Sequence, residues 1–317
     1  MREFIKEQDF QKQITDTVMP YLAARAKKIP FAARDGAPLY AIRYNADHPR
    51  GTVVVVHGFS ENADKYYELM YYLLREELSV LVYDQRGHGR SQRDADTNII
   101  HIDRFTHYVD DLEAVLAGLA GTLPQPLYLF AHSMGGAVAM LFLEKHGDVF
   151  QKAILSAPMI ALKYRGVTRV AATALCRFCT LTGRAKHPVF TAKKDYENEP
   201  FETSSSLSPA RFAYLRALRR SDPLLRGGSP SYAWSQAALG VTKSIFKKGS
   251  PASVTVPLLI YAAEHEHLVS PKAQKKLAAA LPHCTLKTVQ GSKHEILFAN
   301  DEILHPVLEE MLDFYNS

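Results

Sequence analysis

The stretch that most constrains the fold covers residues 127–136 and reads LYLFAHSMGG. Five residues with strand character lead into His132 and Ser133, and two glycines then open an apolar, helix-like stretch. A serine on such a sharp turn stands clear of the sheet edge, because the strained backbone lifts its hydroxyl away from neighbouring side chains. The stretch therefore predicts a strand, a sharp turn carrying a nucleophilic Ser133, and a helix, with Ala131 in place of the first glycine of the G-x-S-x-G pattern.

Strand-like and helix-like stretches alternate on both sides of this turn. The expected strands are residues 31–34, 39–44, 51–58, 79–83, 127–131, 153–158, 257–263 and 286–289. Helical patterns follow most of them, and residues 1–30 predict an amphipathic arm or helix. Alternation of this kind indicates right-handed βαβ units, so the predicted fold class is α/β, with a doubly wound, mostly parallel sheet.

The alternation stops between residues 161 and 250, where the sequence is helical and loop-like. We expect a core built from residues 1–160 and 251–317, with residues 161–250 inserted as a helical cap or lid. This inserted segment holds 16 Lys and Arg against 5 Asp and Glu, a balance of +11, whereas the rest of the chain has a balance of −6. The basic segment could be only a solvated face, but its charge favours attraction to anionic lipid or to a phosphate-bearing substrate.

Composition limits the other possibilities. The chain has 317 residues, of which 47% are hydrophobic, so it can bury a full core. Its three cysteines form no even disulfide framework, and no apolar run approaches the roughly 20 residues of a membrane span. No signal peptide is recognisable, so we expect a cytoplasmic protein, peripheral at most on the inner membrane, with no nucleic-acid partner.

A serine hydroxyl needs a base within hydrogen-bond reach and a carboxylate that orients this base. On a doubly wound sheet both should lie just beyond the carboxyl ends of later strands. His294 follows the expected strand 286–289, and two acids, Glu264 and Glu266, follow the strand 257–263. The chain order of nucleophile, acid and histidine is that of the α/β-hydrolases.

The same chemistry needs two backbone N–H groups that bind an oxyanion. The predicted donors are Met134, directly after the nucleophile, and Phe59, at a turn that Gly58 allows. Gly58, His132 and Trp234 are the predicted substrate-binding residues. Of these, His132 is expected to pack beside the turn without transferring a proton. Trp234 belongs to a group of apolar residues that could line an acyl-chain channel or form the core of the cap itself.

These motifs together resemble the monoacylglycerol lipase and lysophospholipase branch of the α/β-hydrolases. The resemblance rests on HG at residues 57–58, DQRGHGRS at 84–91, AHSMGG at 131–136 and the late His294. The chain is most similar to the membrane-associated lysophospholipases of Gram-negative bacteria, in Ala131, in residues 227–234 and in the Glu-rich loop at residues 264–266. The residue matching the acid position, which usually holds Asp, is Glu266.

The resemblance implies an α/β-hydrolase fold and a serine hydrolase that cleaves the carboxylic ester of lysophospholipids through an acyl-enzyme. Ser133, Glu266 and His294 would be the triad, with no metal and no organic cofactor. One alternative is a monoacylglycerol lipase or general carboxylesterase that is indifferent to the head-group phosphate. Another is a non-catalytic relative that binds lipid or a partner, although such relatives usually lack a member of the triad.

Overall fold

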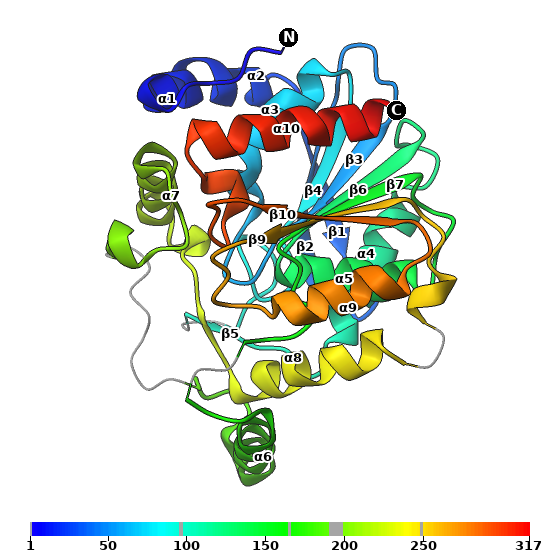
Figure 1. Cartoon of the computed structure of the whole chain (residues 1–317), viewed down its shortest axis with the longest axis vertical. Coiled ribbons are helices and arrows are strands. Elements are labelled where there is room, and N and C mark those ends of the chain that lie inside the picture. Colours follow the sequence, from blue (N-terminus) through cyan, green and yellow to red (C-terminus); the bar gives the residue numbers. More distant parts are fainter. Residues whose placement is uncertain (1, 95–97, 164–165, 190–198, 248–249) are drawn as a thin grey trace.

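A mixed sheet of eight strands forms the centre of the molecule (Figure 1). The computed structural model describes residues 2–94, 98–163, 166–189, 199–247 and 250–317. In sheet order the strands are β1 (Ala26–Ala32), β2 (Pro38–Tyr44), β4 (Ser79–Tyr83), β3 (Thr52–Val56), β6 (Leu127–His132), β7 (Lys152–Ser156), β9 (Leu258–Ala263) and β10 (Cys284–Val289). The pairs β1–β2 and β2–β4 are antiparallel and all others are parallel, so the predicted mostly parallel sheet is confirmed.

Helices cover both faces of the sheet, as the predicted doubly wound arrangement requires. One face is covered by α1 (Phe10–Gln13), α2 (Met19–Ala23), α3 (Tyr67–Arg75) and α10 (Asp301–Asn316). The other is covered by α4 (Thr106–Gly118), α5 (Met134–Leu143), α8 (Tyr232–Ile245) and α9 (Pro271–Ala280). The four valines of β3 alternate between these two hydrophobic layers and are fully buried, which explains why that strand is a continuous β-branched run.

The N-terminal segment differs from its expected outline. Instead of one arm ending near Pro30, α1 and α2 are joined by a π-helical turn at Ile14–Val18, and β1 then begins at Ala26, five residues before the expected strand. The ladder with β2 extends back to the pair Ala26 and Tyr44. Residues 26–28 are all exposed at this end of the edge strand, so Lys27 and Lys28 can point to opposite faces and both reach solvent, although their polarity hides the strand in the sequence.

Between β7 and β9 the chain leaves the sheet, and this is where the cap was predicted. It forms α6 (Arg169–Cys179), α7 (Pro209–Ser221) and α8, and a two-residue strand, β8 (Ser229–Pro230), pairs with β5 (Ile99–Ile100). In Figure 1, α7 lies beside α1, whereas α6 lies against α8 at the opposite end of the molecule. Since these helices contact different parts of the core, treating residues 161–250 as one cap stays our interpretation.

Candidate active site

Ser133 lies on a sharp turn between β6 and α5. Its backbone has φ +50° and ψ −115°, a strained conformation for a residue with a side chain. The turn is held by the Ser133 N–H, which donates to the carbonyl of Ser156 at 3.0 Å. A Cβ at Gly135 would lie 2.2 Å from the carbonyl oxygen of Val56, so only glycine lets the helix approach β3 this closely. The strand–turn–helix predicted from the sequence is present.

The structure brings the three predicted triad residues together, although they are far apart in the sequence. His294 follows β10, and its Nε2 lies 2.9 Å from Ser133 Oγ. On the other side of the ring, Nδ1 lies 2.7 Å from Glu266 Oε2, which follows β9. A carboxylate accepts only, so we assign the proton to Nδ1, which leaves Nε2 free to accept from the Ser133 hydroxyl.

The Glu266 carboxylate is buried and held on both oxygens. Oε1 accepts from the backbone N–H groups of His267, Leu268 and Val269 at 2.8, 2.8 and 3.3 Å, while Oε2 faces His294. Burial alone would raise the pKa of Glu266, but the hydrogen bond and charge of His294 and the backbone N–H groups outweigh it. The pKa of Glu266 therefore lies below its ordinary value, and the carboxylate stays charged at neutral pH.

Glu264, the other acid left open by the sequence, lies elsewhere. Its Oε2 accepts from the backbone N–H of Gly291 at 2.6 Å, on the exposed side of the loop. It makes no contact with His294 among the described residues. The geometry therefore places Glu266, and not Glu264, at the position of a triad acid.

His294 is buried, which by itself disfavours its charged form. The hydrogen bond and charge of Glu266, together with the nearby charge of Glu295, outweigh this effect and raise the pKa of His294 above its ordinary value. The imidazole is therefore a stronger base than an isolated histidine, and its charged form is stabilised where a proton from Ser133 would arrive.

The two predicted oxyanion donors lie at the ends of their elements. Met134 is the first residue of α5, where N–H groups have no partner inside the helix and the helix dipole favours negative charge. Phe59 follows β3, and the carbonyl of the preceding Gly58 lies 2.7 Å from His57 Nδ1. In a trans peptide the N–H points opposite to the carbonyl, so the Phe59 N–H points away from the His57 ring.

The His57 ring fixes this peptide from behind. Its Nε2 accepts from the backbone N–H of Gln85 at 2.8 Å, so Nδ1 carries the proton and donates to Gly58. Burial lowers the pKa of His57 to about 4, so the ring keeps this neutral form at physiological pH. In the sequence His57 is recognisable only as part of the HG motif, because its partner Gln85 follows a different strand, β4.

Two of the three predicted substrate-binding residues, Gly58 and Trp234, make hydrogen bonds and packing contacts within the protein. Gly58 donates its N–H to Glu61 Oε2 at 2.7 Å, and a Cβ there would lie only 3.0 Å from that carboxyl group. The Trp234 ring lies 4.1 Å from the Phe59 ring, and its Nε1 donates to the Tyr108 hydroxyl at 3.2 Å. Glycine at position 58 thus makes room for Glu61, and Trp234 packs α8 onto the turn after β3.

His132 lies behind the triad, as expected, with its ring centroid 5.1 Å from that of His294. Nδ1 lies 3.1 Å from the carbonyl of Ser156, and Nε2 lies 3.5 Å from Glu61 Oε1 and 3.6 Å from Glu295 Oε2. Because both nitrogens face protein groups and the residue is only 3% exposed, this placement gives no support to a contact between His132 and substrate.

Glu61, His132 and Glu295 are also the residues best placed to hold a metal ion in the described part of the chain. They offer one ligand atom each within 4.8 Å of one another. However, the ammonium of Lys65 already bridges the two carboxylates, at 2.5 Å from Glu61 Oε1 and 2.6 Å from Glu295 Oε2. A cation of the chain itself thus fills this position. The group could not be recognised in the sequence, because its members come from three separate segments.

No helix in the described ranges is both long enough and apolar enough to cross a membrane. Among solved structures, a soluble variant of monoglyceride lipase from Saccharomyces cerevisiae superimposes with a TM-score of 0.70 at 22% identity, covering 92% of this chain and 95% of that one. A thermostable carboxyl esterase from Bacillus coagulans has a TM-score of 0.72 at 19% identity, covering 92% and 98%. These likenesses confirm the α/β-hydrolase fold.

The sequence comparisons identify the family. Residues 47–301 match the family model Hydrolase_4, described as serine aminopeptidase, S33. Lysophospholipase L2 of Escherichia coli strain K12 is 31% identical over 303 residues, covering 90% of this chain and 86% of that protein. Monoacylglycerol lipase of Mycolicibacterium smegmatis is 24% identical over 251 residues, covering 78% and 82%. The chain therefore belongs to the Hydrolase_4 family of α/β-hydrolases, among serine-hydrolase esterases and lipases.

Proposed function

We propose that this chain is a serine hydrolase that cleaves the carboxylic ester of lysophospholipids and releases a fatty acid. The observation that carries the proposal is the hydrogen-bonded series from Ser133 through His294 to Glu266 at the edge of the sheet. The choice of lysophospholipid is supported by the 31% identity to lysophospholipase L2 and by the positive charge of residues 161–250.

The proposed reaction begins when Ser133 Oγ attacks the acyl carbonyl and His294 Nε2 takes the hydroxyl proton. Glu266 orients the imidazole and stabilises its charged form. The N–H groups of Phe59 and Met134 bind the oxyanion, and one such donor typically contributes about 3 kcal/mol of transition-state stabilisation.

The tetrahedral intermediate then collapses, and the bond between the acyl carbon and the alcohol oxygen breaks. His294 gives its proton to the leaving glycerol-containing alcohol, and the acyl group stays on Ser133 as an ester. A water molecule that transfers a proton to His294 attacks this ester, which releases the fatty acid and restores the Ser133 hydroxyl. If a second alcohol replaces the water, the same intermediate leads to acyl transfer. No step needs a metal or organic cofactor.

We further propose a peripheral contact with an anionic membrane through α6 and the turn that follows it. Five of the eight exposed large hydrophobic side chains in the described residues lie in α6, in the turn after it or just before its first turn: Val167, Val170, Leu175, Phe178 and Leu181. Residues 166–189 include Arg169, Arg177, Arg184 and Lys186 but no Asp or Glu. Apolar side chains beside basic ones suit the head-group region of a bilayer, and α6 lies at an outer end of the molecule (Figure 1).

The membrane proposal is tested by vesicle binding. The chain should bind vesicles that contain anionic lipid more strongly than neutral vesicles, and the binding should weaken as salt rises, because salt screens the attraction. Equal binding to both vesicle types, or none, would contradict a basic docking surface.

The second candidate function is a monoacylglycerol lipase or general carboxylesterase, which the likeness to monoglyceride lipases favours. Such an enzyme would ignore the head-group phosphate. A non-catalytic lipid-binding or partner-binding role is the third reading, and the complete Ser–His–Glu series argues against it.

The deciding experiment measures fatty-acid release from a lysophospholipid and from a monoacylglycerol side by side, with Ser133→Ala as control. Faster Ser133-dependent release from the lysophospholipid would support the proposal. Equal or faster release from the neutral lipid would favour the lipase or esterase. Cleavage of neither substrate, or equal cleavage by Ser133→Ala, would overturn the serine-hydrolase assignment.

A further inference from the structure

Lys65 is a buried cation directly behind the candidate active site. It lies in the 3-10 turn Ala63–Tyr66 that precedes α3, and its side chain is only 2% exposed. Its ammonium lies between Glu61 Oε1 at 2.5 Å and Glu295 Oε2 at 2.6 Å. Burial disfavours a charged lysine, but the two carboxylates outweigh this effect and raise the pKa of Lys65 above its ordinary value. The ammonium is therefore charged and shared between two segments of the chain.

The first of these segments is the turn that carries the proposed oxyanion donor Phe59. The other oxygen of Glu61 accepts from the Gly58 N–H at 2.7 Å and from the Tyr66 hydroxyl at 2.6 Å. The Gly58 peptide is thus fixed at its N–H by Glu61 and at its carbonyl by His57. Lys65 in turn fixes the Glu61 carboxylate. A shift of Lys65 would therefore move Glu61 and the Gly58 peptide, and with them the direction in which the Phe59 N–H points.

The second segment is the loop that carries the proposed base. Glu295 directly follows His294, and its carboxylate Oε2 accepts from the Lys65 ammonium at 2.6 Å. The segment is also held through the Glu295 N–H, which donates to the carbonyl of Ser205 at 3.3 Å. A single ammonium therefore joins the turn after β3 to the loop after β10. Lys65 and Glu295 are 230 residues apart in the sequence.

We propose that Lys65 is a positioning residue of the esterase, which keeps the Phe59 N–H and the His294 imidazole in register around Ser133. The proposal rests on the proposed function, since it assigns a role relative to that reaction. Without the ammonium, two largely buried carboxylates would face each other with His132 as the remaining group that contacts both, so their repulsion would move the turn and the loop apart. Oxyanion donors act only when they point at the developing charge, so this movement should lower kcat more than it raises KM.

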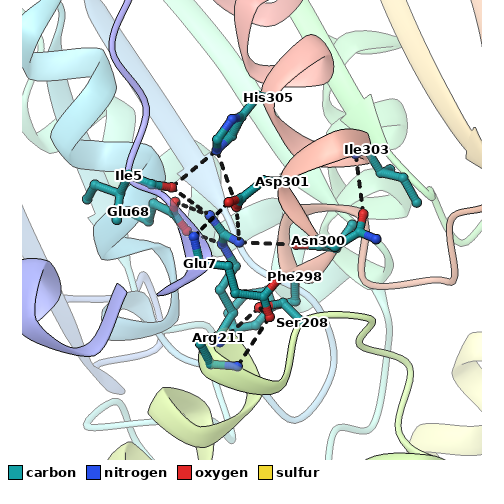
Figure 2. Close-up of polar contacts among 12 residues, drawn as sticks. Ile5, Glu7, Glu68, Ser208, Arg211, Phe298, Asn300, Asp301, Ile303 and His305 are labelled. Carbon is teal, nitrogen blue, oxygen red and sulfur yellow. Dashed lines mark hydrogen bonds and ion pairs between the residues drawn. The ribbon is translucent and has the colours of Figure 1, made fainter. Parts of the chain in front are cut away.

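The chain contains a matched control for burial and ion pairing. Arg211 on α7 is fully buried and also pairs with two carboxylates (Figure 2). It contacts both oxygens of Glu68 at 2.8 and 2.9 Å and Asp301 Oδ1 at 2.9 Å, and it donates to the carbonyl of Ile5 at 3.2 Å. It also donates to the carbonyl of Ala299 at 3.3 Å, at the end of the segment that follows His294. These partners join α7, α3, α10 and two chain segments, and none of them binds the turn that carries Phe59.

The test compares Lys65→Met with Arg211→Met on a soluble short-chain ester, with active sites counted by stoichiometric fluorophosphonate labelling. Counting the sites removes the effect of misfolded protein. We expect both variants to melt at a lower temperature than the wild type. For each labelled site, the kcat of Lys65→Met should be about 30-fold lower than that of the wild type, and its KM should stay within about 3-fold of the wild-type KM. This expected loss in kcat is smaller than the loss caused by removing a whole oxyanion donor. The kcat of Arg211→Met should stay within about 3-fold of the wild type.

Two further variants sharpen the result. Glu295→Gln keeps an oxygen that accepts from Lys65, so its kcat should stay closer to the wild-type value than that of Lys65→Met. If either methionine variant fails to fold, Glu61→Gln and Glu68→Gln form a milder matched pair. Glu61→Gln weakens the ion pair with Lys65, and Glu68→Gln weakens the ion pair with Arg211, both with little change in side-chain volume. Only Glu61→Gln should then lower kcat per site.

The proposal is overturned if kcat per site of Lys65→Met, or of Glu61→Gln in the milder pair, equals the wild-type value. It is also overturned if the Arg211 variant, or Glu68→Gln, loses as much as its counterpart. Ser133→Ala, assayed in the same series, reports separately on the proposed function. If Ser133→Ala hydrolyses the ester like the wild type, the serine-hydrolase assignment fails whatever the Lys65 variants do.

Discussion

The candidate active site and the α6 segment are built in opposite ways. Around Ser133 the polar side chains are buried and tied to partners: Glu266 accepts three backbone N–H groups as well as His294. On α6 and the turn after it, apolar side chains face outward, and Val170 and Leu181 are 79% and 76% exposed. We propose that the two regions have separate roles. The residues at the carboxyl ends of the strands carry out the reaction, and the α6 segment contacts the lipid surface. Variants in the two regions should therefore fail in different assays.

The largest expected effect separates the two acids within the site. Glu266→Gln removes the charge that stabilises protonated His294 and favours the wrong tautomer, so kcat should fall by roughly 10⁴-fold on every ester, as for triad acids elsewhere. Glu264→Gln is the matched control and should stay close to the wild type, because Glu264 contacts Gly291 instead. Steady-state kinetics with a soluble ester check both. A severe loss in Glu264→Gln with little loss in Glu266→Gln would reverse our choice of acid.

A smaller effect is expected at the turn after β3. Gly58→Ala would bring a Cβ within 3.0 to 3.1 Å of the Glu61 carboxyl group, so this side chain or the turn must shift. We expect kcat to fall about 10-fold on soluble and lipid esters alike, less than after loss of a whole oxyanion donor. Gly240→Ala is the matched control, because Gly240, like Gly58, lies outside the positive-φ region and an added Cβ there has no neighbour within 4 Å. Equal activity of Gly58→Ala and the wild type would count against Phe59 as an oxyanion donor.

The helical segment should show the reverse behaviour. Phe178→Asp and Leu181→Asp remove exposed apolar groups, so binding to anionic vesicles should fall several-fold to about 10-fold while kcat on a soluble ester is unchanged. Thr173→Asp on the same helix adds the same charge without removing a large apolar side chain and should bind better than either. If soluble-ester hydrolysis falls together with vesicle binding, the two regions are not separate in function.

The smallest effect is a displacement of the pH profile. The proposed base must be neutral to accept a proton, so activity should rise with pH through the pKa of His294. Because Glu266, Glu295 and Glu61 raise this pKa, the acidic limb of kcat/KM should have its midpoint above 6.5, the ordinary value of histidine. A profile on a soluble ester, with stability checked at each pH, measures it. A midpoint below the ordinary value would contradict the electrostatics of the site.

The sequence was sufficient for features that depend on local pattern. The buried valine run of β3, the turn at Ser133 and the positions of Glu266 and His294 after two strands all follow from short stretches and from the α/β alternation. The choice between Glu264 and Glu266 needed the resemblance to a family, because spacing alone allows both side chains. The structure then shows that only Glu266 reaches the imidazole.

Features that depend on distant partners could not be predicted. Lys65 resembles an ordinary lysine beside a helix until folding brings Glu295 to it. Arg211 is fully buried, but nothing in the sequence distinguishes it from the other basic residues between 161 and 250. The ladder between β5 and β8 has two residues per strand and hence no periodicity to detect. β1 tolerates two adjacent lysines because its first three residues are exposed on both faces at the edge of the sheet.

The most direct test of the account is to trap the acyl group during turnover. The wild-type chain would be mixed with a palmitoyl lysophospholipid, quenched in acid within the first turnovers and mapped by peptide mass spectrometry. We predict that the peptide carrying Ser133 gains the mass of one palmitoyl group, and that Ser133→Ala shows neither this gain nor fatty-acid release. Palmitoyl on a different residue, or undiminished fatty-acid release by Ser133→Ala, would contradict the account.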